Sequence, residues 1–341
     1  MADPTISADR ALGVWLPSIA CWMATIAFGV AGLAGLKPTL GLLEWLPLAV
    51  SLLVFGLPHG AVDHLEIVRL TGRPLSSPTV LLSLLAYLLA AAGVIALWSV
   101  APTVCFAGFI ALTWLHWGQG DLWFALRHED GNRRPLPARL SLVALRGALP
   151  MLGPLAWDPS AYRRIFEATT VLFGSVDTSA AGWQTASELG LVTLVILLFV
   201  HLLVGRHVGS SADRWIDLGE TITLLALFAV VPAVFAVGLY FCAWHGPRHL
   251  VRLARLRTDR PAASWSAVGT TLRQSIPLTV VSIAGGLAIG LWLVSTSSSN
   301  TLADWFGWYL VLISGLTVPH VTVVFWMDQT EHLWFGQRAE A

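Results

Sequence analysis

The chain has 341 residues, of which 56% are hydrophobic and only 12% are charged, with equal numbers of basic and acidic side chains. Soluble domains carry about 25% charged residues, so this composition, with a mean hydropathy of +0.71, excludes an ordinary soluble domain. It indicates a helical protein that crosses a membrane many times. The formal net charge of zero gives no indication of nucleic-acid binding.

Apolar segments long enough to cross a bilayer, about 20 residues each, predict eight membrane-spanning helices. In chain order they cover residues 12–35, 43–65, 79–99, 102–125, 186–204, 218–246, 277–295 and 304–327. The piece 140–174 holds two shorter apolar runs interrupted by Pro150, Pro154 and Pro159, and we expect a hairpin, a re-entrant segment or two short helices there. The predicted fold is therefore an all-α polytopic membrane bundle, forming one membrane-embedded domain over residues 1–341.

The distribution of basic residues predicts the orientation of this bundle. If the piece 140–174 enters and leaves on one side, the basic stretches 69–73, 127–146 and 248–260 share a face with both termini. Lys and Arg are enriched in cytoplasmic loops, so we expect both termini on the cytoplasmic side of the cell (inner) membrane. An ordinary span over 140–157 would instead move the 248–260 stretch to the outer face.

Four stretches place histidines inside or at the end of the predicted spans, where an ionisable side chain is costly and indicates function. They are FGLPHGAVDH (55–64), LHWGQGD (115–121), WHGPRH (244–249) and VPH (318–320). A single such histidine is more often a helix–helix hydrogen-bonding group. However, His59, His116 and His320 each lie about 15 residues into their runs, on helices of the same direction, and therefore at a similar depth.

This convergence predicts a metal site inside the membrane. His245 and His249 are four residues apart, so both imidazoles lie on one helical face and can bind one ion, although Pro247 disturbs a regular helix. His59 and His116, from two other helices, complete a predicted set of four ligands. For His320, direct ligation and support of another ligand both stay open. An imidazole set suits iron, copper or zinc, and the spacing does not choose among them.

Other side chains near these histidines are expected to hold a ligating imidazole or to line a pocket. Asp63 is four residues from His59 and can accept a hydrogen bond from a ligating imidazole, whereas Asp121 can equally be an ordinary helix-end residue. For the aromatic residues, packing against lipid is the alternative. The full set is Phe55, Asp63, His64, Trp117, Gln119, Asp121, Trp244, His320 and Trp326. No catalytic residue beyond the metal ligands is predicted.

The motifs GLPHGAVDH, HWGQGD, WHGPRH and TVPH, in this order, resemble the Brp/Blh family of bacterial and archaeal β-carotene 15,15′-dioxygenases over about residues 43–328. The resemblance implies an integral membrane enzyme that uses iron(II) and O2 to split the central double bond of β-carotene into two retinal molecules, typically destined for a rhodopsin. It places the family's iron ligands on His59, His116, His245 and His249. The chain departs from the family's usual motifs at Trp117 and at Pro247-Arg248. These departures leave open which carotenoid is used and whether cleavage is central or eccentric.

Two other classes of function fit the same residues. Paired histidines on facing helices also bind b-type haem, so a metal or haem protein of electron transfer or transport is one alternative. A non-catalytic carotenoid or retinal carrier, in which the histidines only form hydrogen bonds, is the other. The sequence contains no GxGxxG, P-loop, GxSxG or CxxCH motif, so it does not indicate nucleotide binding, esterase chemistry or covalent haem attachment.

Overall fold

The computed structural model describes residues 11–36, 40–128, 134–174, 179–205, 210–258, 265–296 and 302–334. All regular secondary structure in these ranges is helical, as expected where lipid leaves a helix to satisfy its own backbone. Seven helical segments are long and apolar enough to cross a membrane. They are Gly13–Leu33, Gly41–Thr71, Pro78–Trp98, Leu136–Trp157, Ala180–Gly205, Trp265–Trp292 and Asp304–Thr330. The predicted all-α polytopic bundle is confirmed.

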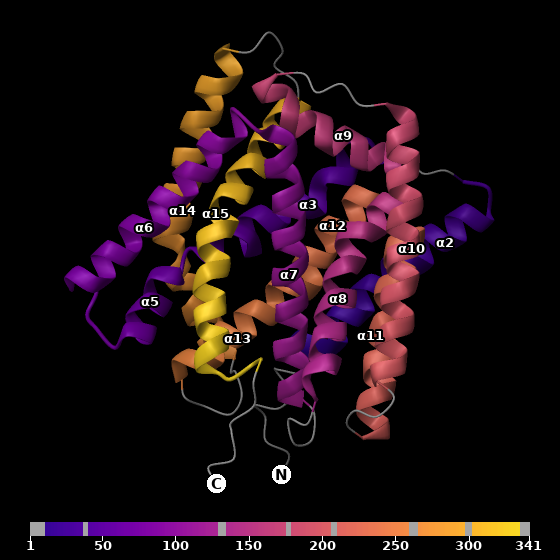
Figure 1. Cartoon of the computed structure of the whole chain (residues 1–341), viewed down its shortest axis with the longest axis horizontal. Helices are drawn as coiled ribbons and strands as arrows, with labels where there is room; N and C mark the ends of the chain where they lie inside the picture. The colour runs from indigo at the N-terminus through magenta and orange to yellow at the C-terminus, as the bar shows by residue number, and fades with distance from the viewer. Residues whose placement is uncertain are drawn as a thin grey trace.

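The helices surround a central group formed by α7, α8, α12 and α15, with α9 lying across one end (Figure 1). The α-helices are α2 (Leu16–Leu33), α3 (Leu46–Ser51), α4 (Leu57–Gly60), α5 (Asp63–Thr71), α6 (Pro78–Trp98), α7 (Pro102–His128), α8 (Leu136–Trp157), α9 (Pro159–Thr170), α10 (Ala180–Gly205), α11 (Ser211–Val230), α12 (Ala233–Tyr240), α13 (Gly246–Thr258), α14 (Trp265–Thr296) and α15 (Leu302–Thr330). Short π or 3₁₀ segments are η1 (Ala11–Trp15), η2 (Gly41–Trp45), η3 (Leu52–Gly56), η4 (Val171–Phe173) and η5 (Phe241–His245).

The chain turns back on itself inside the segment predicted as one span, 218–246. Glu220 and Arg248 form an ion pair at 2.5 Å, although a continuous helix would separate them by about 42 Å. The turn falls at Val231, whose ψ is 139°, and at Pro232. Proline pushes the preceding residue out of the helical region and lacks the N–H that a continuing helix needs. The segment therefore holds α11 and the start of an opposed α12–α13 run.

The piece 140–174 forms two helices, which was one of the predicted alternatives, but the first of them is long enough to cross a membrane. It holds α8, a 22-residue helix with Pro150 and Pro154 in its interior, followed by α9. About two thirds of the apolar window of α8 is buried. Because α8 lies within protein rather than against lipid, neighbouring helices can compensate for the backbone hydrogen bonds that its prolines remove.

These two differences offset each other in the orientation of the bundle. An added span at α8 and a reversal after α11 together return α13 to the end of the bundle where the described chain begins. Arg248 Nε donates to the Gly13 carbonyl at 2.9 Å, and Arg252 binds Glu331 at 2.6 Å. Residues close to both ends of the chain therefore lie beside the basic start of α13.

Two glycines bring the central helices α7 and α8 into close contact. A Cβ atom added at Gly118 would overlap the carbonyl oxygen of Val143, and one added at Gly147 would overlap that of Trp114. Small residues allow membrane helices to approach in this way. Trp114 Nε1 also donates to the Ala144 carbonyl at 2.7 Å. Gly118 of the HWGQGD motif is therefore a point of close helix approach.

Substitution of Gly118 by alanine is expected to destabilise the bundle, because the added methyl group meets rigid backbone. Overpacking of this kind costs about 1–3 kcal/mol. The matched control is Gly108→Ala in the same helix, where an added Cβ meets nothing within 4 Å. Thermal unfolding of the purified variants in detergent should show a lower midpoint for Gly118→Ala alone. Equal midpoints for both variants would contradict the packing described here.

Candidate metal centre

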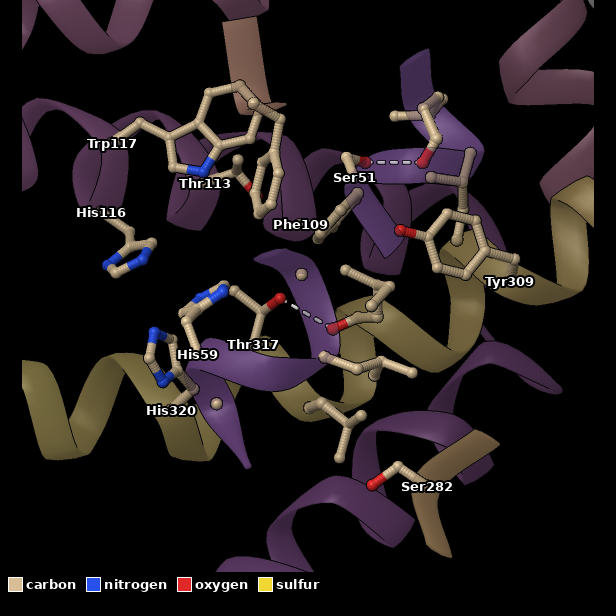
Figure 2. Close-up of a pocket in the computed structure, with 18 of the residues that line it drawn as sticks. Ser51, His59, Phe109, Thr113, His116, Trp117, Ser282, Tyr309, Thr317 and His320 are labelled. Carbon is tan, nitrogen blue, oxygen red and sulfur yellow. Dashed lines mark hydrogen bonds between the residues drawn. The ribbon is translucent and has the colours of Figure 1, made fainter. Parts of the chain in front are cut away.

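Five histidines from separate parts of the chain converge inside the bundle, and all five are buried. Ligand atoms of His59 on α4, His116 on α7 and His245 in η5 lie within 4.8 Å of one another. His249 on α13 has its ring centroid 5.0 Å from that of His59. The ring of His320 on α15 lies 4.7 Å from His59 and 4.9 Å from His116. Figure 2 shows His59, His116 and His320 side by side at one edge of a pocket.

The hydrogen bonds of these rings leave nitrogen lone pairs free. His59 Nδ1 lies 2.5 Å from the Phe55 carbonyl oxygen, which can only accept, so Nδ1 carries the proton and Nε2 keeps its lone pair. Both ring nitrogens of His116, and Nε2 of His245, His249 and His320, are buried without a protein partner. Buried polar atoms without partners are rare in native proteins. Several such atoms at one place suit a bound cation.

Irregular backbone positions the histidines. The π-helical segment η3 ends at Gly56, just before His59, and η5 ends at His245 itself; single π turns are frequent at functional sites. Pro247 falls in the first turn of α13, where a missing N–H costs little, so it does not disturb the histidine pair. The rings of His245 and His249 are nearly parallel, with centroids 6.2 Å apart, as their spacing predicts.

Asp63 lies beside this group and orients one of its rings. Its Oδ2 is 2.8 Å from His320 Nδ1 and accepts a hydrogen bond from Tyr87 of α6 at 3.0 Å. Asp63 was predicted to accept a hydrogen bond from an imidazole. Tyr87 was not predicted, because its only signal in the sequence is a phenol inside an apolar run. His64, also expected here, lines the cavity, with its Nδ1 2.9 Å from the Ala61 carbonyl oxygen.

Gln119 and Asp121, expected at the site, belong to buried polar networks that hold the helices together. Asp121 accepts from Arg248 at 2.8 Å and from Trp244 Nε1 at 3.0 Å. Gln119 donates to Asp328 at 3.0 Å. At 100° per residue, Asp121 is turned about 140° from His116, whereas Gln119 lies only about 60° from it and is directed to Asp328 by its hydrogen bond. These networks connect α7 to α13 and α15.

Of the four aromatic residues predicted to line a pocket, only Trp117 does so, with its ring 5.4 Å from that of His245. Trp244 is fully buried beneath the guanidinium of Arg248, which lies 4.2 Å from its ring. Trp326 is 37% exposed; six residues along α15 place it about 120° from His320. Phe55 packs where α13 begins, because a Cβ added at Gly246 would lie 2.7 Å from it.

Three of the five histidines, His59, His116 and His320, line a cavity of about 700 Å³ with an overwhelmingly apolar lining. Its walls come from α3 to α9, from α12 and η5, and from α14 and α15. They include aromatic rings that lie outside the predicted set: Trp98, Phe106, Phe109, Tyr162, Phe241, Phe306 and Tyr309. A few hydroxyl groups, such as those of Thr113 and Thr317, face the same space (Figure 2). The size is typical of a small-molecule site, and the lining suits an apolar ligand.

A histidine cluster beside an apolar cavity, among helices long and apolar enough to cross a membrane, defines a helical membrane protein with a polar centre next to an apolar cavity. The chain belongs to the β-carotene 15,15′-dioxygenase family, whose model matches residues 50–328. It is 36% identical over 321 residues to the probable β-carotene 15,15′-dioxygenase Blh of Halobacterium salinarum, covering 91% of each chain. It is 28% identical over 316 residues to the probable β-carotene 15,15′-dioxygenase Brp of the same organism, covering 84% of each. No solved structure matches significantly. The resemblance found from the motifs is confirmed.

An ion-pair cluster ties the helix of His249 to that of His320, and it should titrate in acid. Arg252 of α13 binds Asp328 at 2.8 Å and Glu331 at 2.6 Å. Burial alone would raise the pKa of the Glu331 carboxyl, but the Arg252 guanidinium and the Trp123 N–H hold this pKa below its ordinary value.

A carboxyl group with a lowered pKa stabilises the folded state above its unfolded pKa, about 4.3 for Glu. This contribution is lost as the pH falls through the lowered, folded-state value. Glu331→Gln should therefore be less stable than the wild type near neutral pH and lose less further stability on acidification. Thermal midpoints across this pH range test it, with the exposed Glu188→Gln as control. If the thermal midpoints of wild type and Glu331→Gln fell in parallel with pH, the lowered pKa of Glu331 would be contradicted.

Proposed function

We propose that this protein cleaves the central 15,15′ double bond of β-carotene with O2 and releases two molecules of retinal. One oxygen atom of O2 goes to each carbon of the broken double bond, so the reaction balances without a further reductant. Iron(II) is held by His59, His116, His245 and His249. The observation that carries the proposal is a cluster of imidazoles with unpartnered nitrogens beside an apolar cavity that His59, His116 and His320 line.

The donor set fits the proposed metal. Neutral imidazoles bind iron, copper and zinc, and family membership favours iron among these because the family model describes a dioxygenase. The spin state of O2 prevents its direct reaction with a closed-shell polyene. When bound, iron would supply the activation of O2 that this reaction needs. The Phe55 carbonyl serves the site by fixing the tautomer of His59, so that Nε2 presents its lone pair.

The remaining residues position an apolar substrate and exclude water. Trp117 packs against His245 beside the cavity, and Phe109 lies across the same space (Figure 2). These residues would hold the polyene with its reacting bond beside the histidines. Such positioning raises the rate because a bimolecular step becomes effectively unimolecular. The scarcity of polar groups on the walls keeps water away from a reactive intermediate.

The bilayer supplies the substrate and sets the orientation. β-Carotene dissolves in lipid rather than water, and O2 partitions into hydrocarbon. We propose that the end of the bundle bearing the arginines of α13 faces the cytoplasm, with both termini there, because basic residues are enriched on the cytoplasmic side of the cell membrane. The retinal formed is released to lipid, where a retinal-binding membrane protein can take it up.

The test is expression in cells that make β-carotene. Wild-type protein should bleach the cells and yield retinal by chromatography, and the purified protein should contain iron by metal analysis. His59→Ala should lose retinal formation and bound iron, since removing a ligand typically costs at least 10–100-fold in metal affinity.

The control is His332→Asn, at an exposed histidine with a positive φ that asparagine tolerates; it should behave as wild type. Membrane levels are compared by immunoblot. Absence of retinal from well-expressed wild type would refute the proposal, and a Soret band would indicate a haem protein instead. Carotenoid binding that survives His59→Ala, without any cleavage by the wild type, would indicate a carrier.

A further inference from the structure

We infer that His320 is a fifth metal-binding imidazole, held in position by Asp63 and Tyr87; this rests on the proposed metal centre. The ring of His320 is 4.7 Å from His59 and 4.9 Å from His116. The ring of His249, one of the four expected ligands, is 5.0 Å and 6.0 Å from the same two rings. His320 is therefore nearer to them than an expected ligand is.

The hydrogen bonds of His320 are those of a ligand rather than of a packing residue. Its Nδ1 faces the Asp63 carboxylate at 2.8 Å, which fixes the proton on Nδ1. Its Nε2 is then a lone-pair atom, buried and without a protein partner. A carboxylate behind a histidine, with the other nitrogen turned to the metal, is the usual way in which proteins orient such ligands.

Tyr87 extends this arrangement to a third helix. Its hydroxyl donates to the same oxygen of Asp63 that faces His320, so the carboxylate is held from both sides. Asp63 is the first residue of α5 and is almost fully buried. A helix–helix hydrogen bond alone would satisfy Nδ1 but would leave Nε2 without a partner in a ring that packs against those of His59, His116 and His249.

Metal titration of the purified, metal-depleted protein distinguishes a metal-binding role of His320 from a purely structural hydrogen-bonding role. Asp63→Asn disturbs only the orientation of His320 and should weaken Fe(II) binding by about 10–100-fold, as is typical for the loss of an outer-shell partner. His320→Gln removes the ligand itself and should weaken binding more. Co(II) serves as a spectroscopic probe, because its visible bands change with the number of ligands. His320→Gln should change the Co(II) spectrum, whereas His332→Asn should leave spectrum and affinity unchanged.

Wild-type affinity and an unchanged Co(II) spectrum in a folded His320→Gln protein would overturn the inference. If that variant does not fold, Asp63→Asn with unchanged affinity and spectrum would also overturn it. Failure of the wild-type protein to bind any metal would refute the proposed centre itself, so the two failures are distinguishable.

A different observation carries a second inference: the cavity opens sideways through the surface of the bundle between α6 and α14. Among the residues that line it, Leu88 of α6 is 64% exposed and Val281 of α14 is 63% exposed. Trp98 and Met151 line the same cavity but are almost fully buried. Figure 1 shows α6 and α14 at the same flank of the molecule. The cavity thus has an open side there and a closed interior.

The position of this opening matches lipid rather than water. Leu88 lies at the centre of the 21-residue helix α6, and Val281 lies well inside the apolar segment Trp265–Trp292. At about 1.5 Å per residue, a residue at the middle of a span lies in the hydrocarbon core. We propose that the polyene enters from the bilayer through this lateral opening; the proposal rests on the function given above.

Neighbouring residues provide matched controls. Leu89 is 63% exposed and Val280 is 57% exposed, on the same two helices, but neither lines the cavity. Tryptophan at Leu88 or Val281 should narrow the opening, whereas tryptophan at Leu89 or Val280 adds the same bulk to a lipid-facing surface. A general effect on folding or insertion would therefore act on both members of each pair.

The variants are compared in phosphatidylcholine vesicles loaded with β-carotene. Leu88→Trp and Val281→Trp should lower kcat/KM about tenfold, which a modest change in a hydrophobic passage can produce, with bound iron unchanged. Their controls should stay close to wild type. Equal behaviour within each pair would overturn the inference.

A second readout does not depend on catalysis. Metal-depleted protein from β-carotene-producing cells should retain less carotenoid in Val281→Trp than in Val280→Trp, and equal retention would count against the opening. If the wild-type protein retains carotenoid but never cleaves it, the proposed function fails while the lateral opening still stands.

Discussion

The constraint on which this structure depends is that polar groups inside a membrane bundle must find partners without water. The protein meets it in two ways. Carboxylates and guanidinium groups pair with each other, as Asp121 and Arg248 do. Imidazoles, in contrast, gather with nitrogens left over. The first arrangement pairs opposite charges within the protein, whereas the second leaves several imidazole nitrogens of one cluster without a protein partner. This difference supports the histidine cluster as the candidate functional centre.

Helix α7 joins the two arrangements. His116 faces the cavity, and Gln119 and Asp121, further along the helix, face the polar networks. Helix α13 repeats the pattern, because His249 faces the cluster while Arg248 and Arg252 pair with acidic side chains. The ionic networks therefore fix the rotation of the helices that carry the imidazoles. A buried ion pair adds little net stability over apolar packing, but it specifies one rotation and one depth.

Local patterns were sufficient for much of this description. Long apolar runs predicted the membrane bundle, the i,i+4 spacing predicted that His245 and His249 would lie together, and equal depth predicted that His59, His116 and His320 would approach them. Aromatic neighbours in sequence were poor guides to the pocket. Trp244 and Trp326 lie on other faces of their helices, and the walls come from residues such as Phe109 and Tyr309 that carry no motif.

The sequence by itself determined the class of protein, its family and the meeting of distant histidines, because hydrophobicity and residue spacing act locally along each helix. Only the tertiary structure decided the reversal at Val231–Pro232, the passage of α8 through the bundle and the pairing of Asp63 with His320. These features depend on which helices lie side by side. A proline can kink a helix or reverse the chain, and a carboxylate can face an imidazole or a guanidinium, so long-range packing makes the choice.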